Sequence, residues 1–352
     1  MSRRGSNKLM ILMISLFFSL LIGALIFTMC GYSPVSAYAA IFRGGLGNRS
    51  AIINSLSQMT VIAFMGLAYI IAFKAGICNI GLEGQMFVGA IVAAITGVYI
   101  KGLPQILHLL VVFVLSTAAA GVWGVLISTL KLKFGANEII TAIMLNFIAE
   151  YFTSYLVNGP MKVEGTVAQS EKVNASAQLP NLVDTPQLTS GILIFIVLTF
   201  IIFGVMKYTK FGFELRVTGE NTLAANTGGI SSGKVMSSAM FISGAIAGAA
   251  GVVIVVGMNG RFIDGFSPGY GWDGVAVASL AGLSIIGNIF SAFLFGVLRA
   301  GATVVSRTAS IPYDFIVVIQ AFIVLLLGCP KLSEDLIAKV RKLAGRREKK
   351  DE

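Results

Sequence analysis

Charged residues are scarce in this chain of 352 residues. Asp, Glu, Lys and Arg make up only 12% of it, whereas hydrophobic residues make up 56% and the mean hydropathy is +0.87. A soluble domain carries about 25% charged residues. The shortage indicates a polytopic membrane protein, and the gaps between its apolar runs leave no room for a separate soluble domain of about 100 residues.

Side chains for metal or redox chemistry are scarce as well. The chain has one histidine, His108, and three cysteines, Cys30, Cys78 and Cys329, with no metal-binding or redox spacing. A metal site needs several ligands, so we interpret His108 as a buried or interfacial hydrogen-bonding residue and the cysteines as small packing residues. The sequence has no Gly-x-x-x-x-Gly-Lys-Ser/Thr phosphate loop, so we expect no ATP hydrolysis by this chain itself.

The excess of basic residues is better explained by membrane topology than by a nucleic-acid partner, and we expect no such partner. The formal net charge is +10, but Lys and Arg flank the apolar runs, as the positive-inside rule describes. The basic residues in segment 1–8 place the N-terminus in the cytoplasm, and the net basic tail 329–352 is expected there too. The first apolar run, 9–30, is too long for a signal peptide, so we expect a retained anchor.

The apolar runs predict an all-α membrane helix bundle with about ten transmembrane segments between residues 9 and 328. Their ranges are 9–30, 51–73, a third run ending near 100, 106–130, 138–157, 191–206, 235–257, 274–287, 289–306 and 314–328. The short run 274–287 and its neighbour 289–306 are either two short spans or a re-entrant segment and one span. An even number of crossings agrees with two cytoplasmic termini.

The longer connections differ in polarity. Residues 31–50 are expected to form a Gly-rich outer loop, and residues 158–190 a polar external loop that could help dock a partner. Residues 207–234 are polar and basic, so they are expected in the cytoplasm. In the run 235–257, Gly244 and Gly248 are four residues apart, which permits close helix contact.

The chain also divides into two halves of five segments, which would have opposite topology. The third segment of each half begins with a Gly-flanked acid, in Gly81-Leu-Glu83-Gly84 and in Gly271-Trp-Asp273-Gly274. An inverted five-helix repeat of this kind is a transporter arrangement with sites at the repeat interface. The likeness is slight, so chance similarity is the alternative.

The stretch 73–96 brings polar residues into apolar surroundings. It contains Lys74, Asn79, Glu83 and Gln85, interrupted by glycines. Ionisable groups beside lipid are costly unless paired or hydrated, and Gly-rich broken segments occur where they line a cavity or lie inside protein. Two interpretations stay open: this stretch is part of the wall of a substrate pathway, or it is a cytoplasmic loop with a helix cap at Asn79.

A second informative stretch is 209–230. Phe211, Phe213 and Leu215 would form a short exposed surface that binds a partner, and glycines bound a short helix from about 220 to 226. A well-solvated loop is the alternative, because loops are usually surface.

From about residue 50 to 328, the sequence resembles the permease subunits of bacterial ABC importers for ribose-type sugars, nucleosides and branched-chain amino acids. The motifs that carry the resemblance are Asn79-Ile-Gly-Leu-Glu-Gly-Gln85, Ala136-Asn-Glu-Ile-Ile-Thr-Ala-Ile-Met-Leu-Asn146, the stretch 209–230 and Gly265-Phe-Ser-Pro-Gly-Tyr-Gly-Trp-Asp-Gly274. The first and last motifs and the lengthened loop 158–190 are most similar to the nucleoside branch, whose permeases come as unlike pairs.

The resemblance implies a non-enzymatic permease of the bacterial plasma (inner) membrane that pairs with a second homologous permease. ABC ATPases would bind ATP and Mg in the cytoplasm, and an extracellular substrate-binding lipoprotein or periplasmic protein would deliver the substrate. This chain would carry no cofactor and would contact membrane lipid. The loop after the sixth span would hold the coupling helix, from Phe213 to Gly229. Its implied contacts to the ATPase are Phe213, Glu214, Arg216, Glu220 and Asn221.

A nucleoside substrate needs hydrogen-bond partners for its ribose and base, and an aromatic or apolar wall. The candidates for the substrate pathway are Asn79, Glu83, Gln85, Asn146 and Trp272. Alternatives stay open for two of them. Trp272 is equally suited to an interfacial aromatic belt, and Glu83 would pair structurally with Arg299 or Lys74 instead of contacting substrate.

Three other functions stay open. The same architecture would import a simple sugar of the ribose or galactose type, or a branched-chain amino acid. An ion-coupled secondary transporter would need acids along its pathway, and only Glu83 and Glu150 lie well inside apolar runs. An export permease or a scaffold of a membrane complex would not depend on an external binding protein.

Overall fold

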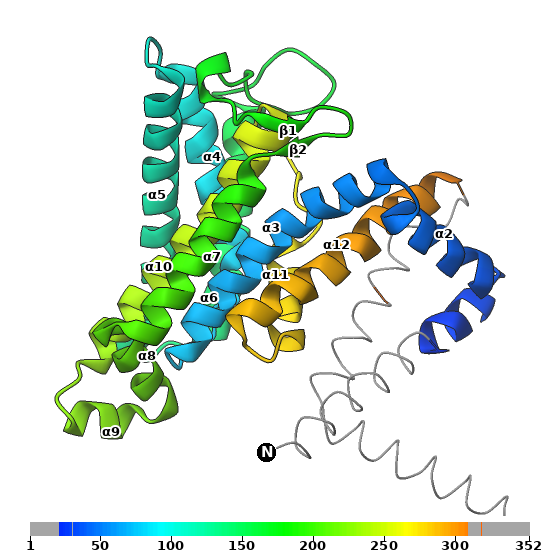
Figure 1. Ribbon diagram of the computed structural model, residues 1–352. Coiled ribbons are helices and arrows are strands. Elements are labelled where there is room, and N and C mark those ends of the chain that lie inside the picture. Colours follow the sequence, from blue (N-terminus) through cyan, green and yellow to red (C-terminus); the bar gives the residue numbers. More distant parts are fainter. Residues whose placement is uncertain (1–20, 30, 309–317, 319–352) are drawn as a thin grey trace, which may run out of the picture. The chain divides into compact units, whose positions relative to one another are not determined.

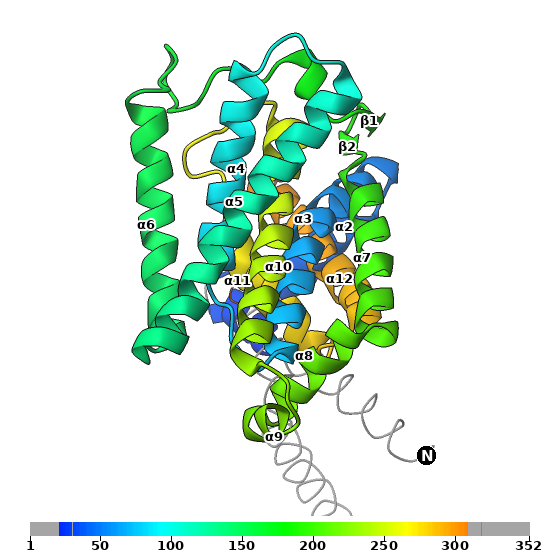
Figure 2. The same ribbon diagram turned by 90° about the vertical axis from the view of Figure 1, so that its left-hand side faces the viewer.

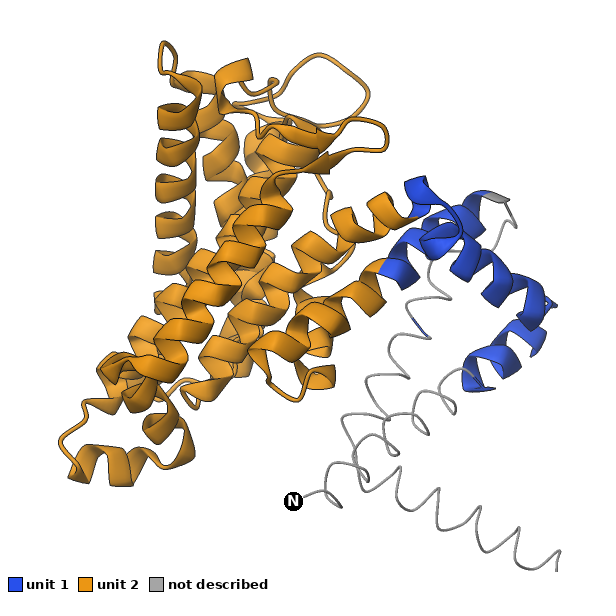
Figure 3. Ribbon diagram, in the orientation of Figure 1, with its two compact units in different colours: residues 1–51, 297–352 blue, residues 52–296 orange. Residues whose placement is uncertain are grey.

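The computed structural model describes residues 21–29, 31–308 and 318, and the chain divides into two compact units (Figure 3). Unit 1 comprises residues 1–51 and 297–352, and unit 2 comprises residues 52–296. The predicted last span at 314–328, most of the first span at 9–30 and both expected cytoplasmic termini lie outside the described residues.

Helices dominate the described part of the chain (Figure 1). The long ones are α3 (Arg49–Lys74), α4 (Leu82–Tyr99), α5 (Gln105–Phe134), α6 (Glu138–Asn158), α7 (Gly191–Tyr208), α10 (Ser232–Val252) with its π-helical continuation η2 (Val253–Asn259), and α12 (Ile285–Thr308). Within the described residues, seven helices are long and apolar enough to cross a membrane, or up to eight if the bent pair Leu21–Met29 and Pro34–Leu46 forms one span. The expected number of about ten is not confirmed.

Local chemistry explains several helix ends. Helix α5 ends at Gly135, whose φ of 66° is a left-handed conformation that glycine adopts without strain. Lys131 and Lys133 in its last turn complement the helix dipole. The side chain of Asn137 then caps α6 by accepting hydrogen bonds from the amides of Ile139 and Ile140. The predicted span boundaries at 130 and 138 are therefore close to those observed.

Glycine allows the helices at the centre of unit 2 to approach closely. A side-chain carbon on Gly244 of α10 would collide with the carbonyl oxygen of Ala120 in α5, and one on Gly89 of α4 would collide with the backbone of Gly248. The predicted close contact through Gly244 and Gly248 is confirmed. The most apolar stretch of 18 residues in each long helix is buried to different extents. In α3, and in α10 with its continuation η2, 83% of this stretch is buried, whereas the share is 22% in α6 and 28% in α7. Helices α3 and α10 are therefore central, whereas α6 and α7 are peripheral.

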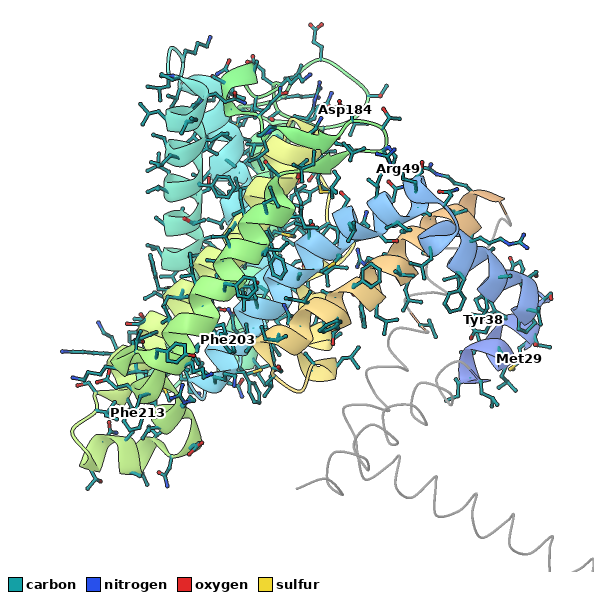
Figure 4. All side chains as sticks on the ribbon, in the orientation of Figure 1. Met29, Tyr38, Arg49, Asp184, Phe203 and Phe213 are labelled. Atoms are coloured by element: carbon teal, nitrogen blue, oxygen red, sulfur yellow. The ribbon has the colours of Figure 1, made fainter. Side chains whose placement is uncertain are left out.

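The two ends of unit 2 carry different connections, as Figures 1 and 2 show. At one end lie the short helices α8 (Lys210–Glu220) and α9 (Thr222–Thr227). At the other lie residues 159–190, with the 3-10 helix η1 (Ala175–Ala177) and the antiparallel strands β1 (Asn181–Val183) and β2 (Leu188–Thr189). The side chains of Phe213 and Asp184 mark the two ends in Figure 4.

The predicted structural role of His108 is confirmed. Its side chain is fully buried, with Nδ1 2.8 Å from Ser176 Oγ and Nε2 3.3 Å from the carbonyl oxygen of Thr96. Asn174 Nδ2 donates to the carbonyl oxygens of Gly97 and Val98, in the last turn of α4, and of Ile100, which follows the helix. The polar loop 158–190 is therefore anchored on the bundle.

The prediction that residues 31–50 form a loop was wrong. Residues 31–50 contain the helix α2 (Pro34–Leu46), which starts with a proline in its first turn, where the missing N–H costs nothing. Within unit 1, Gly44 packs directly against Val304 of α12, a close approach that stabilises the helix. In the stretch 209–230, the predicted short helix at about 220–226 is confirmed as α9, and a further helix, α8, precedes it from residue 210.

Residues 274–306 were predicted to form either two short spans or a re-entrant segment and one span, and the structure favours the second arrangement. Helix α11 (Tyr270–Leu280) has 11 residues and at 1.5 Å per residue it is about 16 Å long, too short to cross a bilayer. Helix α12, with 24 residues, is long enough. The structure therefore has one short helix and one long helix, and not two equally short spans.

Candidate functional site

Polar side chains at the beginning of α4 are joined in a closed hydrogen-bonded cluster. Asn79 Nδ2 donates to Gln85 Oε1 at 2.9 Å and to Ser243 Oγ at 2.8 Å, while Gln85 Nε2 donates back to Asn79 Oδ1 at 3.1 Å. Ser243 Oγ in turn donates to the carbonyl oxygen of Ala68 at 2.7 Å. The cluster therefore links α3, α4 and α10.

Asn146 holds α6 to the same helix start. Its Nδ2 donates to the carbonyl oxygen of Ile80 at 3.0 Å, and its Oδ1 accepts from the amide of Gly84 at 2.8 Å. Glycine is required at position 84 because a side-chain carbon there would lie 2.9 Å from Asn146 Cα. The amide of Gly84 is one of the donors that a helix start leaves without an intrahelical partner, so Asn146 acts as a cap from a different helix.

Glu83 connects α4 to the loop that leads into α11. Its carboxylate accepts from Ser267 Oγ and from the amide of Gly271. Ser267 Oγ also accepts from the amide of Tyr270 at 3.3 Å. A carboxylate in the first turn of α4 is favoured by the helix dipole. The two Gly-flanked acid motifs are therefore in contact, and the inverted repeat itself stays a prediction.

The five predicted pathway residues differ in exposure. Asn79 and Gln85 are fully buried and Asn146 is 8% exposed, whereas Trp272, in the first turn of α11, is 52% exposed. In this conformation the geometry makes the three amide residues structural links between helices, and leaves Trp272 accessible to lipid or a ligand. Their contact with substrate stays a prediction, as does the alternative pair of Glu83 with Arg299. Lys74, the other predicted partner of Glu83, lines a hollow together with Lys207 and Arg216.

Helices α8 and α9 form a two-helix elbow with caps at each joint. The side chain of Thr209 accepts from the amide of Gly212, and that of Asn221 accepts from the amide of Ala224. Asn221 therefore ends α8 and caps α9. On the exposed side of the elbow, the Phe213 side chain is 55% exposed and the Leu223 side chain is 78% exposed. Two large apolar side chains are therefore accessible on this elbow.

One side of α8, which carries Gly212, Leu215 and Thr218, faces inward. Leu215 is fully buried, so the prediction that it belongs to the exposed surface was wrong. Arg216 Nη1 donates to the carbonyl oxygen of Met206 at the end of α7. Gly219 packs on the backbone carbonyl of Lys74 at the end of α3. Helix α8 is thus fastened to both α3 and α7.

The polar residues predicted for ATPase coupling lie around the same elbow. Glu220 and Asn221 are exposed at its bend, and Glu214 is paired with Lys210 at 3.5 Å. Arg216 is directed toward α7. The structure does not test contact of any of these residues with an ATPase, so that role stays a prediction.

Glu150 is not among the residues predicted from the sequence for the substrate pathway. Glu150 is exposed on the candidate span α6, and with Tyr151, Ser154 and Asp264 it lines a hollow of about 300 Å³. Asp264 Oδ2 accepts from Ser154 Oγ at 2.9 Å. An acid within an apolar run was the signal that could have identified this position.

Comparisons with known proteins point to membrane transport. The family model described as branched-chain amino acid transport system / permease component matches residues 51–327. The chain is 32% identical to a guanosine ABC transporter permease of Bacillus subtilis, over 96% of this chain and 97% of that one. It is 29% identical to a nucleoside ABC transporter permease of Lactococcus lactis, over 96% and 95% of the two chains.

A glucose ABC transporter permease of Haloferax volcanii is 30% identical over 88% of this chain and 84% of its own length. No solved structure matches the chain significantly. The apolar helices and the family match together indicate an integral membrane protein. The chain belongs to the family of branched-chain amino acid transport system permease components.

Proposed function

We propose that this chain is the transmembrane permease subunit of an ATP-driven ABC importer that translocates nucleosides. The observation that carries the proposal is similarity over 96% of the chain to a guanosine permease and to a nucleoside permease. The fold supports it, because an elbow with exposed apolar side chains lies at one end of long apolar helices.

The distribution of charge supports a cytoplasmic position for the α8–α9 end. The basic residues at that end of unit 2 are Lys74, Lys131, Lys133, Lys207, Lys210, Arg216 and Lys234. The acids there are fewer, namely Glu138, Glu214 and Glu220. Cytoplasmic segments of membrane proteins carry such an excess of Lys and Arg. Both chain termini would lie on the same side, in the bacterial plasma membrane.

In the proposed mechanism, ABC ATPases that bind ATP and Mg move the α8–α9 elbow. The elbow can transmit a push because α8 is fastened to α7 through Arg216 and to α3 through Gly219. Rigid-body rocking of the long helices would then alternate access to a central pathway. Phe213, Glu220 and Asn221, which are exposed on the elbow, would contact the ATPase.

A second, unlike permease would cover the exposed side of α6. That helix is a candidate span, and only 22% of its most apolar stretch of 18 residues is buried. It also carries an exposed carboxylate at Glu150. A carboxylate facing lipid is costly, so this side is better suited to a hydrated path or a protein interface. An extracellular substrate-binding lipoprotein would deliver the nucleoside at the opposite end, where residues 158–190 lie.

Import of a simple sugar is the second candidate, favoured by the similarity to the glucose permease. The test is uptake of radiolabelled guanosine or glucose into proteoliposomes that hold this chain with its partner permease, ATPases and binding protein. We expect guanosine uptake that requires ATP and the binding protein, with no glucose uptake. Glucose uptake without guanosine uptake would establish the second candidate. Uptake by this chain alone under an ion gradient would refute the importer proposal.

A further inference from the structure

Basic side chains gather in a hollow at the α8–α9 end of unit 2. The hollow measures about 390 Å³. It is lined by the ends of α3 and α7, by Arg216 of α8, by the turn between α11 and α12 and by the start of α12. Its charged residues are Lys74, Lys207 and Arg216, and none of the described residues that line it is acidic. Lys74 comes from a position 133 residues before Lys207, so the fold, and not a run in the sequence, brings these charges together.

The charges of the hollow are not neutralised by carboxylates of the described residues. The ion pairs at this end join Lys131 to Glu138 and Lys210 to Glu214, and both lie outside the hollow. Arg216 donates to a backbone carbonyl oxygen, which uses only part of the donor capacity of a guanidinium group. Three cations that share one concave space favour an anionic ligand.

The other walls of the hollow are apolar. They are formed by Phe203 and Met206 of α7 and by Ile285 of α12. Helix α7 is a peripheral candidate span, because only 28% of its most apolar stretch is buried. Figure 4 shows Phe203 near this end of α7. Lys207 Nζ lies 5.6 Å from the ring centre of Phe203 and 5.1 Å from that of Tyr208. Both distances are within the range of a cation–π contact, so the ammonium group of Lys207 lies close to the aromatic part of this wall.

We propose that this hollow binds the phosphate headgroup of an anionic phospholipid. Basic hollows between membrane helices on the cytoplasmic side are suited to anionic headgroups, and the apolar wall of α7 would contact the acyl chains. Free phosphate has the same charge chemistry but lacks chains to occupy that wall. The site goes beyond the proposed transport function, because neither substrate passage nor ATPase contact requires it.

The test measures lipid bound to the full-length chain purified in detergent, by native mass spectrometry during titration with phosphatidylglycerol or phosphatidylcholine. In the double variant Lys74→Gln/Lys207→Gln, we expect phosphatidylglycerol binding to weaken roughly 30-fold, as two basic residues at an anionic surface would predict. Binding of phosphatidylcholine should not change. The variant Lys74→Arg/Lys207→Arg should keep the affinity for phosphatidylglycerol.

The matched control is Lys133→Gln/Lys234→Gln, which removes two exposed charges from the same end of unit 2 but outside the hollow. It should bind phosphatidylglycerol like the wild type. Equal binding by the Lys74→Gln/Lys207→Gln variant would overturn the proposal, and so would an equal loss in the control. Displacement of phosphatidylglycerol from the wild type by inorganic phosphate would show a free-anion site and would also overturn it.

Discussion

At the residue scale, the amide cluster at the start of α4 shows how polar side chains are accommodated in an apolar bundle. Asn79 makes hydrogen bonds to Gln85, Ser243 and the amide of Gly81, so its amide group is satisfied from three directions. Buried polar groups are tolerated when they are paired in this way. The cluster also requires α3, α4 and α10 to keep one relative position, which a rigid-body mechanism needs.

Replacement of Asn79 by alanine should destabilise the protein. The change leaves Gln85 and Ser243 buried with fewer partners, and an unsatisfied buried polar group costs about 1–3 kcal/mol. Thermal unfolding of the purified chain in detergent would show a lower midpoint. Asn259→Ala, at an exposed position, is the control and should unfold like the wild type. An unchanged midpoint in Asn79→Ala would refute the structural role of the cluster.

The residue types of this cluster could be identified from the sequence, but their arrangement could not. Asn79 and Gln85 stand out because they are polar within an apolar chain. Their partner Ser243 is 164 residues away from Asn79, and the sequence does not indicate that the two side chains meet. The role of His108 could be predicted because a lone histidine has few alternatives. Without tertiary contacts, a satisfied amide and a substrate-binding amide have the same sequence signal.

At the element scale, the α8–α9 elbow combines a buried anchor with an exposed apolar tip. Gly212 and Leu215 are buried on the inner side of α8, whereas Phe213 and Leu223 are exposed. The long spans could be predicted because Lys or Asn residues mark their ends. The residues of α8 by themselves do not predict a helix, because the segment is short, polar and rich in glycine; only the resemblance to importer permeases implied a helix from Phe213 onward. The stability of α8 comes from packing on α3 and α7, which the sequence alone does not show.

Replacing the two exposed apolar side chains of the elbow should separate transport from folding. In Phe213→Ser/Leu223→Ser, we expect ATP-driven guanosine uptake by the assembled importer to fall at least tenfold, as loss of more than about 1.4 kcal/mol of interface contact implies. Membrane insertion and the unfolding midpoint should be unchanged, because neither side chain is buried.

The control for the elbow variant is Val114→Ser/Leu126→Ser. It removes two exposed apolar side chains from α5, away from the elbow. This control should transport like the wild type. Normal uptake by the elbow variant would mean that these two side chains do not couple ATP hydrolysis to transport.

At the scale of the whole molecule, the proposed function makes the protein a passive helix bundle that ABC ATPases move from the α8–α9 end. Helix α10 packs closely on α4 and α5 through glycines, and the elbow is fastened to α3 and α7. The peripheral helices α6 and α7 expose apolar faces. The number of spans could not be counted from the sequence, because α11 is as apolar as a span but has only 11 residues. Hydropathy measures composition and does not distinguish a crossing from a short buried helix.

The most direct test of the central claim is the position of the elbow in the assembled transporter. A single cysteine replaces Phe213 in a chain in which Cys30, Cys78 and Cys329 are changed to serine. A membrane-impermeant thiol reagent should label it in inside-out vesicles only, and a thiol-reactive crosslinker should join it to an ATP-binding subunit. Labelling from the outer face, or no crosslink to such a subunit in a transporter that is active, would contradict the account.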